Sequence, residues 1–245
     1  MRLSSFAGTD VGLARSGNED SHLRGRTVFA VADGLGGHQG GEVASAMAVE
    51  PLAALDGRAF ADADQAAEAL TAAIRAANQA ILQRGRSDPE LWGMGTTVTA
   101  AAVAHDRVLQ LAHVGDSRAY LLRKGAPLRQ LTTDHTVVAE AVERGLLTRQ
   151  QAAIHPQRGV VTRAVGLDPD VLVDLPEPLE LEPGDQVLLC SDGLTEVVDD
   201  DQIAGVLADR ADGGDACRAL IAAANRAGGP DNITVVLLRV ADRAR

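Results

Sequence analysis

Four aspartates stand next to apolar, β-branched segments that are far apart in the sequence. Asp33 follows V-F-A-V-A, Asp116 follows L-A-H-V-G, Asp192 follows V-L-L-C-S, and Asp231 precedes N-I-T-V-V. Carboxylates at the ends of several strands are the oxygen ligands that hard divalent cations prefer. Each aspartate could instead be a turn residue, since Asp before Gly or Asn is a common turn signal. Two of the hydrophobic segments end in the same D-G-L tripeptide. This repetition favours a single metal site and indicates phosphoryl chemistry.

A second group of polar residues comes just before the first of these strands, in T-D-V-G-L-A-R-S-G-N-E-D-S, residues 9–21. The planar guanidinium of Arg15 suits a phosphate group, which makes Arg15 a candidate phosphate clamp. The alternative for Arg15 is an ion pair with Glu19, four residues later. Glu19 and Asp20 could hold waters bound to a metal.

A glycine-rich turn, D-G-L-G-G-H-Q-G-G-E, spans residues 33–42. It does not match a dinucleotide-binding fingerprint, because the third glycine position counted from Gly34 is Gln39, and it contains no P-loop lysine. A backbone that must approach a metal and a phosphate explains the glycines equally well. His38 could protonate a leaving alkoxide, or it could be an ordinary polar loop residue. Ser117 lacks a nucleophile-elbow context, which disfavours covalent serine catalysis.

The hydrophobic pattern predicts antiparallel strands. We expect a meander in which 95–104 pairs with 107–114 through a turn at His105-Asp106, and 107–114 pairs with 117–123 through Gly115-Asp116. The predicted strands are 27–32, 95–104, 107–114, 117–123, 186–191 and 232–240.

Three helices are predicted around these strands. One spans 63–84, with Asp62 as its cap and Gly85 at its end, and a second spans 213–227 before Gly228-Gly229-Pro230. A third starts near Gly41 and is kinked or stopped at Pro51. Amphipathic helices with antiparallel strands indicate helices outside and two sheets packed face to face within. The segment 132–166 has the pattern of a flap of short helices.

Composition limits the partners of this 245-residue chain, which we expect to form a single domain, 1–245. A net charge of −11 disfavours nucleic acid and anionic membrane surfaces as partners. The start has no apolar signal core, and no run approaches 18 apolar residues, so a cytoplasmic location is expected. Cys190 and Cys217 are interpreted as small buried hydrophobes in a reducing compartment.

Seven motifs, taken together and in this order, resemble those of the bacterial metal-dependent Ser/Thr protein phosphatases, the type 2C (PPM) family. The resemblance covers nearly the whole chain and is specific as a set. The motifs are T-D-V-G-L-A-R-S-G-N-E-D-S, A-D-G-L-G-G-H-Q-G-G-E, G-M-G-T-T, H-V-G-D-S-R-A-Y, L-T-T-D-H-T, S-D-G-L-T-E and G-G-P-D-N-I-T-V.

The resemblance implies an α+β fold, a four-layer α-β-β-α sandwich with two central antiparallel sheets, and a centre of two Mn²⁺ or Mg²⁺ ions at one end of the sheets. Asp33 would bridge both ions, and the direct ligands would be completed by the Gly34 carbonyl, Asp192 and Asp231. Asp116 would bind a third, weaker ion. Arg15 matches the phosphate-binding arginine of the family, and Glu19 and Asp20 match its water-mediated metal contacts.

One position departs from the pattern of the eukaryotic members. There the proposed general acid directly follows the Asp-Gly pair, whereas this chain has Leu35 at that place and its histidine at His38. His38 is therefore only a candidate general acid, and a metal-bound water is the alternative. A hydroxide bridging two cations would attack phosphorus in line, while Arg15 and the metals stabilise the equatorial oxygens.

The predicted function is hydrolysis of phosphoserine and phosphothreonine in proteins by a monomeric enzyme. Opposition to a bacterial Ser/Thr kinase is implied by the resemblance alone. The alternatives are a metal-dependent phosphatase for small phosphate esters and a regulatory module that binds a phosphoprotein without hydrolysing it. The sequence ends at Arg245, just beyond the last predicted strand, so the chain is either a free enzyme or part of a longer one.

Overall fold

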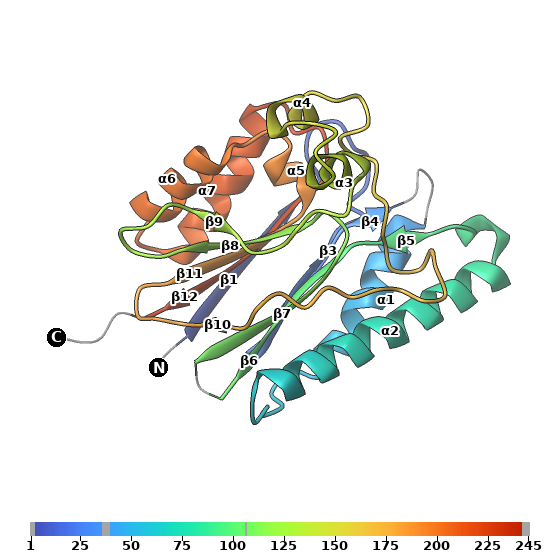
Figure 1. Ribbon diagram of the computed structural model, residues 1–245, viewed down its shortest axis with the longest axis horizontal. Coiled ribbons are helices and arrows are strands. Elements are labelled where there is room, and N and C mark those ends of the chain that lie inside the picture. Colours follow the sequence, from blue (N-terminus) through green and yellow to red (C-terminus); the bar gives the residue numbers. More distant parts are fainter. Residues whose placement is uncertain (1–2, 36–39, 106, 242–245) are drawn as a thin grey trace.

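The computed structural model describes residues 3–35, 40–105 and 107–241. Two five-stranded antiparallel sheets pack face to face, and helices cover their outer faces (Figure 1). This is the predicted α+β sandwich. The first sheet has the order β1 (Leu3–Asp10), β12 (Ile233–Val240), β11 (Gln186–Cys190), β8 (Arg118–Leu122) and β9 (Arg129–Gln130). The second has the order β10 (Leu179–Glu180), β7 (Val108–Val114), β6 (Val98–Ala104), β3 (Val28–Ala32) and β2 (Ser21–Arg24).

The remaining elements cover the sheets or lie at one end of them. Helices α1 (Gly41–Ala53) and α2 (Ala63–Ser87) pack on the second sheet, and α6 (Asp200–Asp209) and α7 (Gly213–Arg226) pack on the first. The short elements are β4 (Gly34–Leu35), β5 (Gly95–Thr96), η1 (Pro89–Leu91), α3 (Val137–Glu143), α4 (Arg149–Ala153) and α5 (Asp192–Thr195). Within the described ranges, no helix is both long enough and apolar enough to cross a membrane.

The four layers follow from the alternation of side chains along each strand. In β3, Phe29 and Val31 face the core between the two sheets, whereas Val28, Ala30 and Ala32 face α1 and α2. The strands of the first sheet divide in the same way, so that both faces of each central strand are buried. Cys190 and Cys217 both belong to the core beneath α6 and α7, as predicted for small buried hydrophobes.

The helix predictions are confirmed in position and corrected at their ends. The Asp62 side chain accepts the Gln65 N–H at 2.8 Å and caps α2. The helix does not end at Gly85 but continues to Ser87. Gly85 is buried, and a Cβ there would lie 3.1 Å from the Leu91 carbonyl oxygen, so the glycine serves close packing. Pro51 does not stop α1, which extends to Ala53. Proline in the last turn removes only one of the final backbone bonds.

Two strand predictions are wrong. β7 and β8 do not form a meander, because they belong to different sheets, and the chain crosses between the sheets at Gly115. Gly115 has φ 110°, and a Cβ there would lie 2.6 Å from the Thr97 side chain. The predicted strand 95–104 is interrupted at Thr97, whose N–H donates to the Asp33 carbonyl oxygen at 2.8 Å. The pairing of β6 with β7 is confirmed; of the predicted turn between them, residue 106 lies outside the described residues.

The segment 132–166 contains the short helices α3 and α4, as predicted, and lies over the end of the sandwich that carries α5 (Figure 1). One bridge closes its base, and another ties its C-terminal end to the sandwich. Thr136 pairs with Val161 across the base of the segment, and Val165 pairs with Thr96 next to β6. We call residues 132–166 the flap.

Candidate metal centre

Two of the predicted carboxylates meet across the sandwich. Asp33 directly follows β3 of the second sheet, and Asp192 begins α5 immediately after β11 of the first sheet. Their side chains lie close enough for each to shift the pKa of the other. Burial, followed by the charge of Asp192, raises the pKa of Asp33 well above its ordinary value, and burial, followed by the charge of Asp116, raises that of Asp192. The packing of the sheets thus forces like charges together.

Asp116 and Asp20 extend this acidic cluster. Burial raises the pKa of each to about 6, with the charge of Asp134 next in effect at Asp116. At Asp20 the effect of burial is opposed by hydrogen bonds from Thr234 and Ser191, and the Ser191 hydroxyl lies 2.8 Å from Oδ2. The other oxygen of Asp20, Oδ1, is buried without a hydrogen-bond partner. A buried carboxylate oxygen with no donor is the type of group that a cation satisfies.

Asp231 is engaged by the predicted phosphate clamp. The Arg15 guanidinium lies 2.5 Å from Asp231 Oδ2, and Asp231 Oδ1 accepts the N–H of Asn232 at 2.8 Å. The hydrogen bond to Asp231 raises the pKa of Arg15. Arg15 therefore pairs with Asp231, and Glu19, its alternative partner, acts on it only as a nearby charge. About half of the Arg15 side chain (49%) is exposed, which leaves it accessible to an anion.

The carboxylate oxygens of the acidic cluster suit a hard divalent cation, although the side chains lie in pairs and not around one point. In the part of the chain that the structure describes, no group of three or more His, Cys, Asp or Glu side chains is arranged so as to hold an ion. Asp33 and Asp192 instead lie beside each other, and Asp231 pairs with Arg15. All the donors are oxygens. Burial, and after it the repulsion from neighbouring carboxylates, raises the pKa values of Asp33, Asp192 and Asp116, and divalent cations would offset that repulsion.

Gly34 and Glu19 lie close to the backbone at the start of α1. A Cβ on Gly34 would lie 2.3 Å from the Gly41 carbonyl oxygen and 2.7 Å from that of Glu19, so only glycine fits. Burial raises the pKa of Glu19. The Glu19 carboxylate faces Gly41, where a Cβ would lie 2.2 Å from Oε2. The candidate general acid, His38, lies outside the described residues.

Sequence reasoning missed the hydroxyl groups that hold the backbone of Asp33. Thr97 Oγ1 accepts the Asp33 N–H at 3.0 Å and lies 2.7 Å from the hydroxyl of Ser117, the residue next to Asp116. Thr96 Oγ1 donates to the Asp33 carbonyl oxygen at 2.8 Å. The motif G-M-G-T-T contained the signal, but no role was derived for it. Ser117 is fully buried, in keeping with the prediction that it is not a nucleophile.

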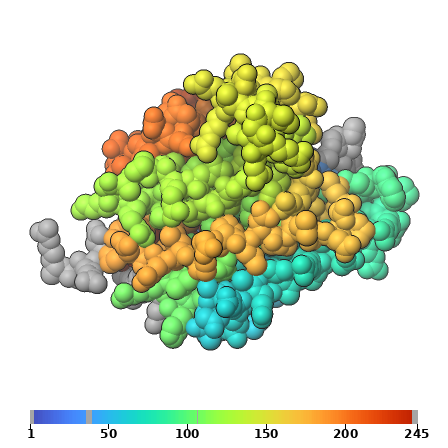
Figure 2. Space-filling view, viewed as in Figure 1, coloured from blue at the N-terminus to red at the C-terminus, as the bar shows by residue number. Residues whose placement is uncertain are grey.

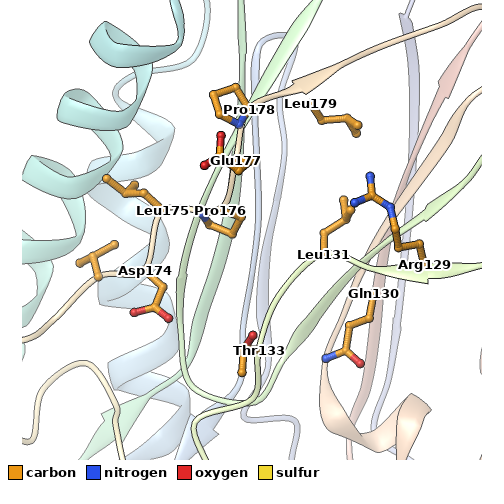
Figure 3. A pocket seen from close by; sticks show the side chains of 11 residues that line it. Arg129, Gln130, Leu131, Thr133, Asp174, Leu175, Pro176, Glu177, Pro178 and Leu179 are labelled. Carbon is orange, nitrogen blue, oxygen red and sulfur yellow. The ribbon is translucent and has the colours of Figure 1, made fainter. Parts of the chain in front are cut away.

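A cavity of about 720 Å³ lies elsewhere, along the flank of the sandwich. Figure 2 shows the orange segment that includes residues 173–179 running across this face below the yellow-green β8–β9 region. Figure 3 shows Arg129, Thr133, Asp174 and Glu177 among its lining side chains. None of the predicted site residues lines this cavity, so the acidic cluster is separate from it.

Fold and site together fit a class of enzymes that build a phosphoryl-transfer site from acidic strand ends of a two-sheet sandwich. Comparison with known proteins gives the family. The profile of Protein phosphatase 2C matches residues 9–233, and the chain belongs to this family.

Similar proteins are bacterial. The serine/threonine protein phosphatase PstP of Mycobacterium tuberculosis is 44% identical over 98% of this chain, which spans only 45% of the length of PstP. Protein phosphatase PhpP of Streptococcus pneumoniae is 38% identical, and the match covers 94% of each chain. The crystal structure of M. tuberculosis PstP has a TM-score of 0.90 at 42% identity, with 98% of this chain and 99% of that one covered. The PstP catalytic domain in complex with two manganese ions has a TM-score of 0.88 at 41% identity and the same coverage.

Proposed function

We propose that this chain hydrolyses phosphoserine and phosphothreonine in proteins with the help of divalent cations. The observation that carries the proposal is the buried acidic cluster in which Asp33 and Asp192, from different sheets, lie beside each other and near Asp116 and Asp20. Family membership supports it, since relatives with similar sequences are named serine/threonine protein phosphatases and one was crystallised with two manganese ions.

The cluster has the donors to hold two Mn²⁺ or Mg²⁺ ions. Asp33 would contact both, with the Gly34 carbonyl, Asp192 and Asp231 as further direct ligands. Asp116 would hold a third ion, and Glu19 and Asp20 would act through water. Cations bound there would supply the acidity that makes a water nucleophilic at neutral pH, as a hydroxide between two ions, and would offset the charge of the phosphate.

The residues of the chain itself would position the phosphate. Arg15 is half exposed beside Asp231, and in the loaded enzyme its two-pronged guanidinium would bind phosphate oxygens in place of the carboxylate. Burial of Asp33 and Asp192 keeps their carboxylates from being screened by water. His38 stays a candidate for the proton donor to the leaving serine or threonine oxygen.

The remaining features of the proposal concern context. The substrates would be phosphorylated proteins, and the enzyme would oppose a bacterial Ser/Thr kinase. Residues 1–245 would act as one catalytic domain and as a monomer. The cytoplasmic location stays a prediction.

The test is phosphate release from a phosphothreonine peptide by the purified protein with Mn²⁺, with EDTA and Asp192→Asn as controls. We expect turnover that both controls abolish, while circular dichroism shows that Asp192→Asn is folded. Turnover retained in EDTA or in Asp192→Asn would contradict the proposed site. A preference for small phosphate esters over the peptide would favour the small-ester phosphatase, and folded, manganese-binding protein without turnover would favour a binding module.

A further inference from the structure

Asn232 is almost fully buried, with 4% of its surface exposed, and its side-chain amide uses every polar atom. Nδ2 donates to the carbonyl oxygens of Val11 and Gly17, both at 2.9 Å, and Oδ1 accepts the Glu19 N–H at 2.8 Å. Two carbonyls at one end of the amide and an N–H at the other fix its orientation. One side chain therefore holds the beginning and the end of the loop 11–19.

This loop has no regular structure of its own, since all of residues 11–20 are described and none belongs to a helix or strand. It lies against the segment before β12, where the Leu13 N–H donates to the Gly229 carbonyl oxygen at 2.8 Å. Gly12 has φ 77°, and a Cβ there would lie 2.2 Å from the Asp231 carbonyl oxygen. The position of the loop is thus set by residues 229–232 rather than by its own backbone pairing.

The loop carries Arg15, which reaches Asp231, the immediate neighbour of Asn232. A shift of the loop would move the guanidinium relative to the carboxylates. Misplacing a group that binds substrate by about 1 Å can cost about 100-fold in rate. Asn232 itself is too deeply buried to serve as a phosphate ligand.

We propose that Asn232 is a positioning residue that fixes the loop 11–19 so that Arg15 faces the phosphate. The expected effect on catalysis rests on the proposed phosphatase function. The fixing of the loop by Asn232 does not depend on that function.

Asn78 provides a matched control. It is fully buried on α2, its Nδ2 donates to the carbonyl oxygens of Asp168 and Pro169 at 2.8 and 3.3 Å, and its Oδ1 accepts the Gly166 N–H at 2.6 Å. The same three kinds of bond hold a loop there, but residues 166–169 include none of the candidate site residues. A purely structural role predicts similar effects of the two asparagines on stability and no special effect of Asn232 on catalysis.

The first experiment is hydrogen exchange in EDTA, which needs no activity. We expect Asn232→Ala to speed exchange across residues 11–20 at least tenfold, and Asn78→Ala to speed exchange near residue 166 instead. Asn232→Ser keeps a hydroxyl at the site and is the second variant if Asn232→Ala does not fold. Unchanged exchange in the loop would overturn the proposal, whether or not the protein is a phosphatase.

The second experiment measures hydrolysis of a phosphothreonine peptide and its inhibition by inorganic phosphate. We expect Asn232→Ala to lower kcat/KM by about 10- to 100-fold and to weaken phosphate inhibition, whereas Asn78→Ala stays within about twofold of wild type. In an Arg15→Ala background, Asn232→Ala should cause little further loss, because both changes remove one function. Fully additive losses, or equal losses in the Asn78 and Asn232 variants, would overturn the positioning role. Absence of turnover in the wild type would refute the proposed function and leave the exchange result to decide whether Asn232 fixes the loop.

Discussion

Replacing Asp33 by asparagine should stabilise the metal-free protein. In the native fold the Asp33 carboxyl is buried beside Asp192, and burial, followed by the charge of Asp192, raises its pKa. A carboxyl whose pKa is raised in the native state destabilises the fold at every pH above its unfolded-state pKa. The loss grows with pH up to the native pKa and disappears only when the pH is low enough for both states to hold the proton. The amide of the substituted asparagine can donate a hydrogen bond to Asp192, so the contact is kept while one charge is removed.

Two independent estimates give the magnitude. Two carboxylates about 4 Å apart repel each other by about 4 kcal/mol at the effective dielectric constant of about 20 that suits protein sites. Protonating one of them at pH 7, from an ordinary pKa near 3.8, costs about 4 kcal/mol at about 1.4 kcal/mol per unit. We expect a net gain of about 2–4 kcal/mol, or roughly 4–16 °C in Tm for a chain of this size.

The assay is thermal and urea unfolding in EDTA from pH 5 to pH 8.5, followed by the same unfolding with Mn²⁺. The advantage of Asp33→Asn should grow as the pH rises from 5 and should vanish only as the pH falls towards the ordinary carboxyl pKa near 3.8, and Mn²⁺ should stabilise only the wild type. Asp56→Asn is the control of opposite sign. Burial raises the pKa of Asp56, but hydrogen bonds from the N–H groups of Thr27, Arg26 and Val28 outweigh it and lower the pKa. That variant should therefore be destabilised above pH 4, and less so as the pH falls. An Asp33→Asn protein no more stable than wild type at pH 8.5 would refute the repulsion argument.

Three further outcomes follow from single contacts. Arg123→Met should lower the free energy of unfolding in urea by about 2–3 kcal/mol, because Arg123 donates to both oxygens of Asp185, a carboxylate with 1% of its side chain exposed. A loss below about 0.5 kcal/mol would contradict a stabilising role of this ion pair. Gly12→Ala should lower the free energy of unfolding by about 1–3 kcal/mol and should lower kcat/KM, because φ at residue 12 is 77° and the added Cβ would collide with the backbone of Asp231. An unaltered Tm would be inconsistent with that collision. The two buried cysteines, whose pKa values burial raises to about 12 and about 11, should react with a thiol reagent only upon unfolding, and fast labelling of the native protein would argue against their burial.

Much of the fold could be predicted because most central strands are apolar on both faces. β3, β7 and β11 stand out as apolar runs. β1 was not predicted, because L-S-S-F-A-G-T-D has no clear alternation and is strand mainly through its full-length pairing with β12. The crossing at Gly115 also escaped prediction. A short turn between two apolar runs indicates a hairpin locally, and only the packing of two sheets decides that the chain passes from one to the other.

For the site, the residue types could be predicted but their contacts could not. Aspartates at strand ends were identified because strand ends meet at one edge of a sheet, and the structure does bring Asp33 and Asp192 together. The partner of Arg15 could not be predicted from spacing. An interval of four residues brings Arg15 and Glu19 together only in a helix, and residues 11–20 are not helical. The loop that carries them is instead hydrogen-bonded to Asn232, more than 200 residues away in the sequence. The residue that we propose to position the candidate phosphate clamp therefore lies next to Asp231, just before β12, where the local sequence around Arg15 gives no sign of it.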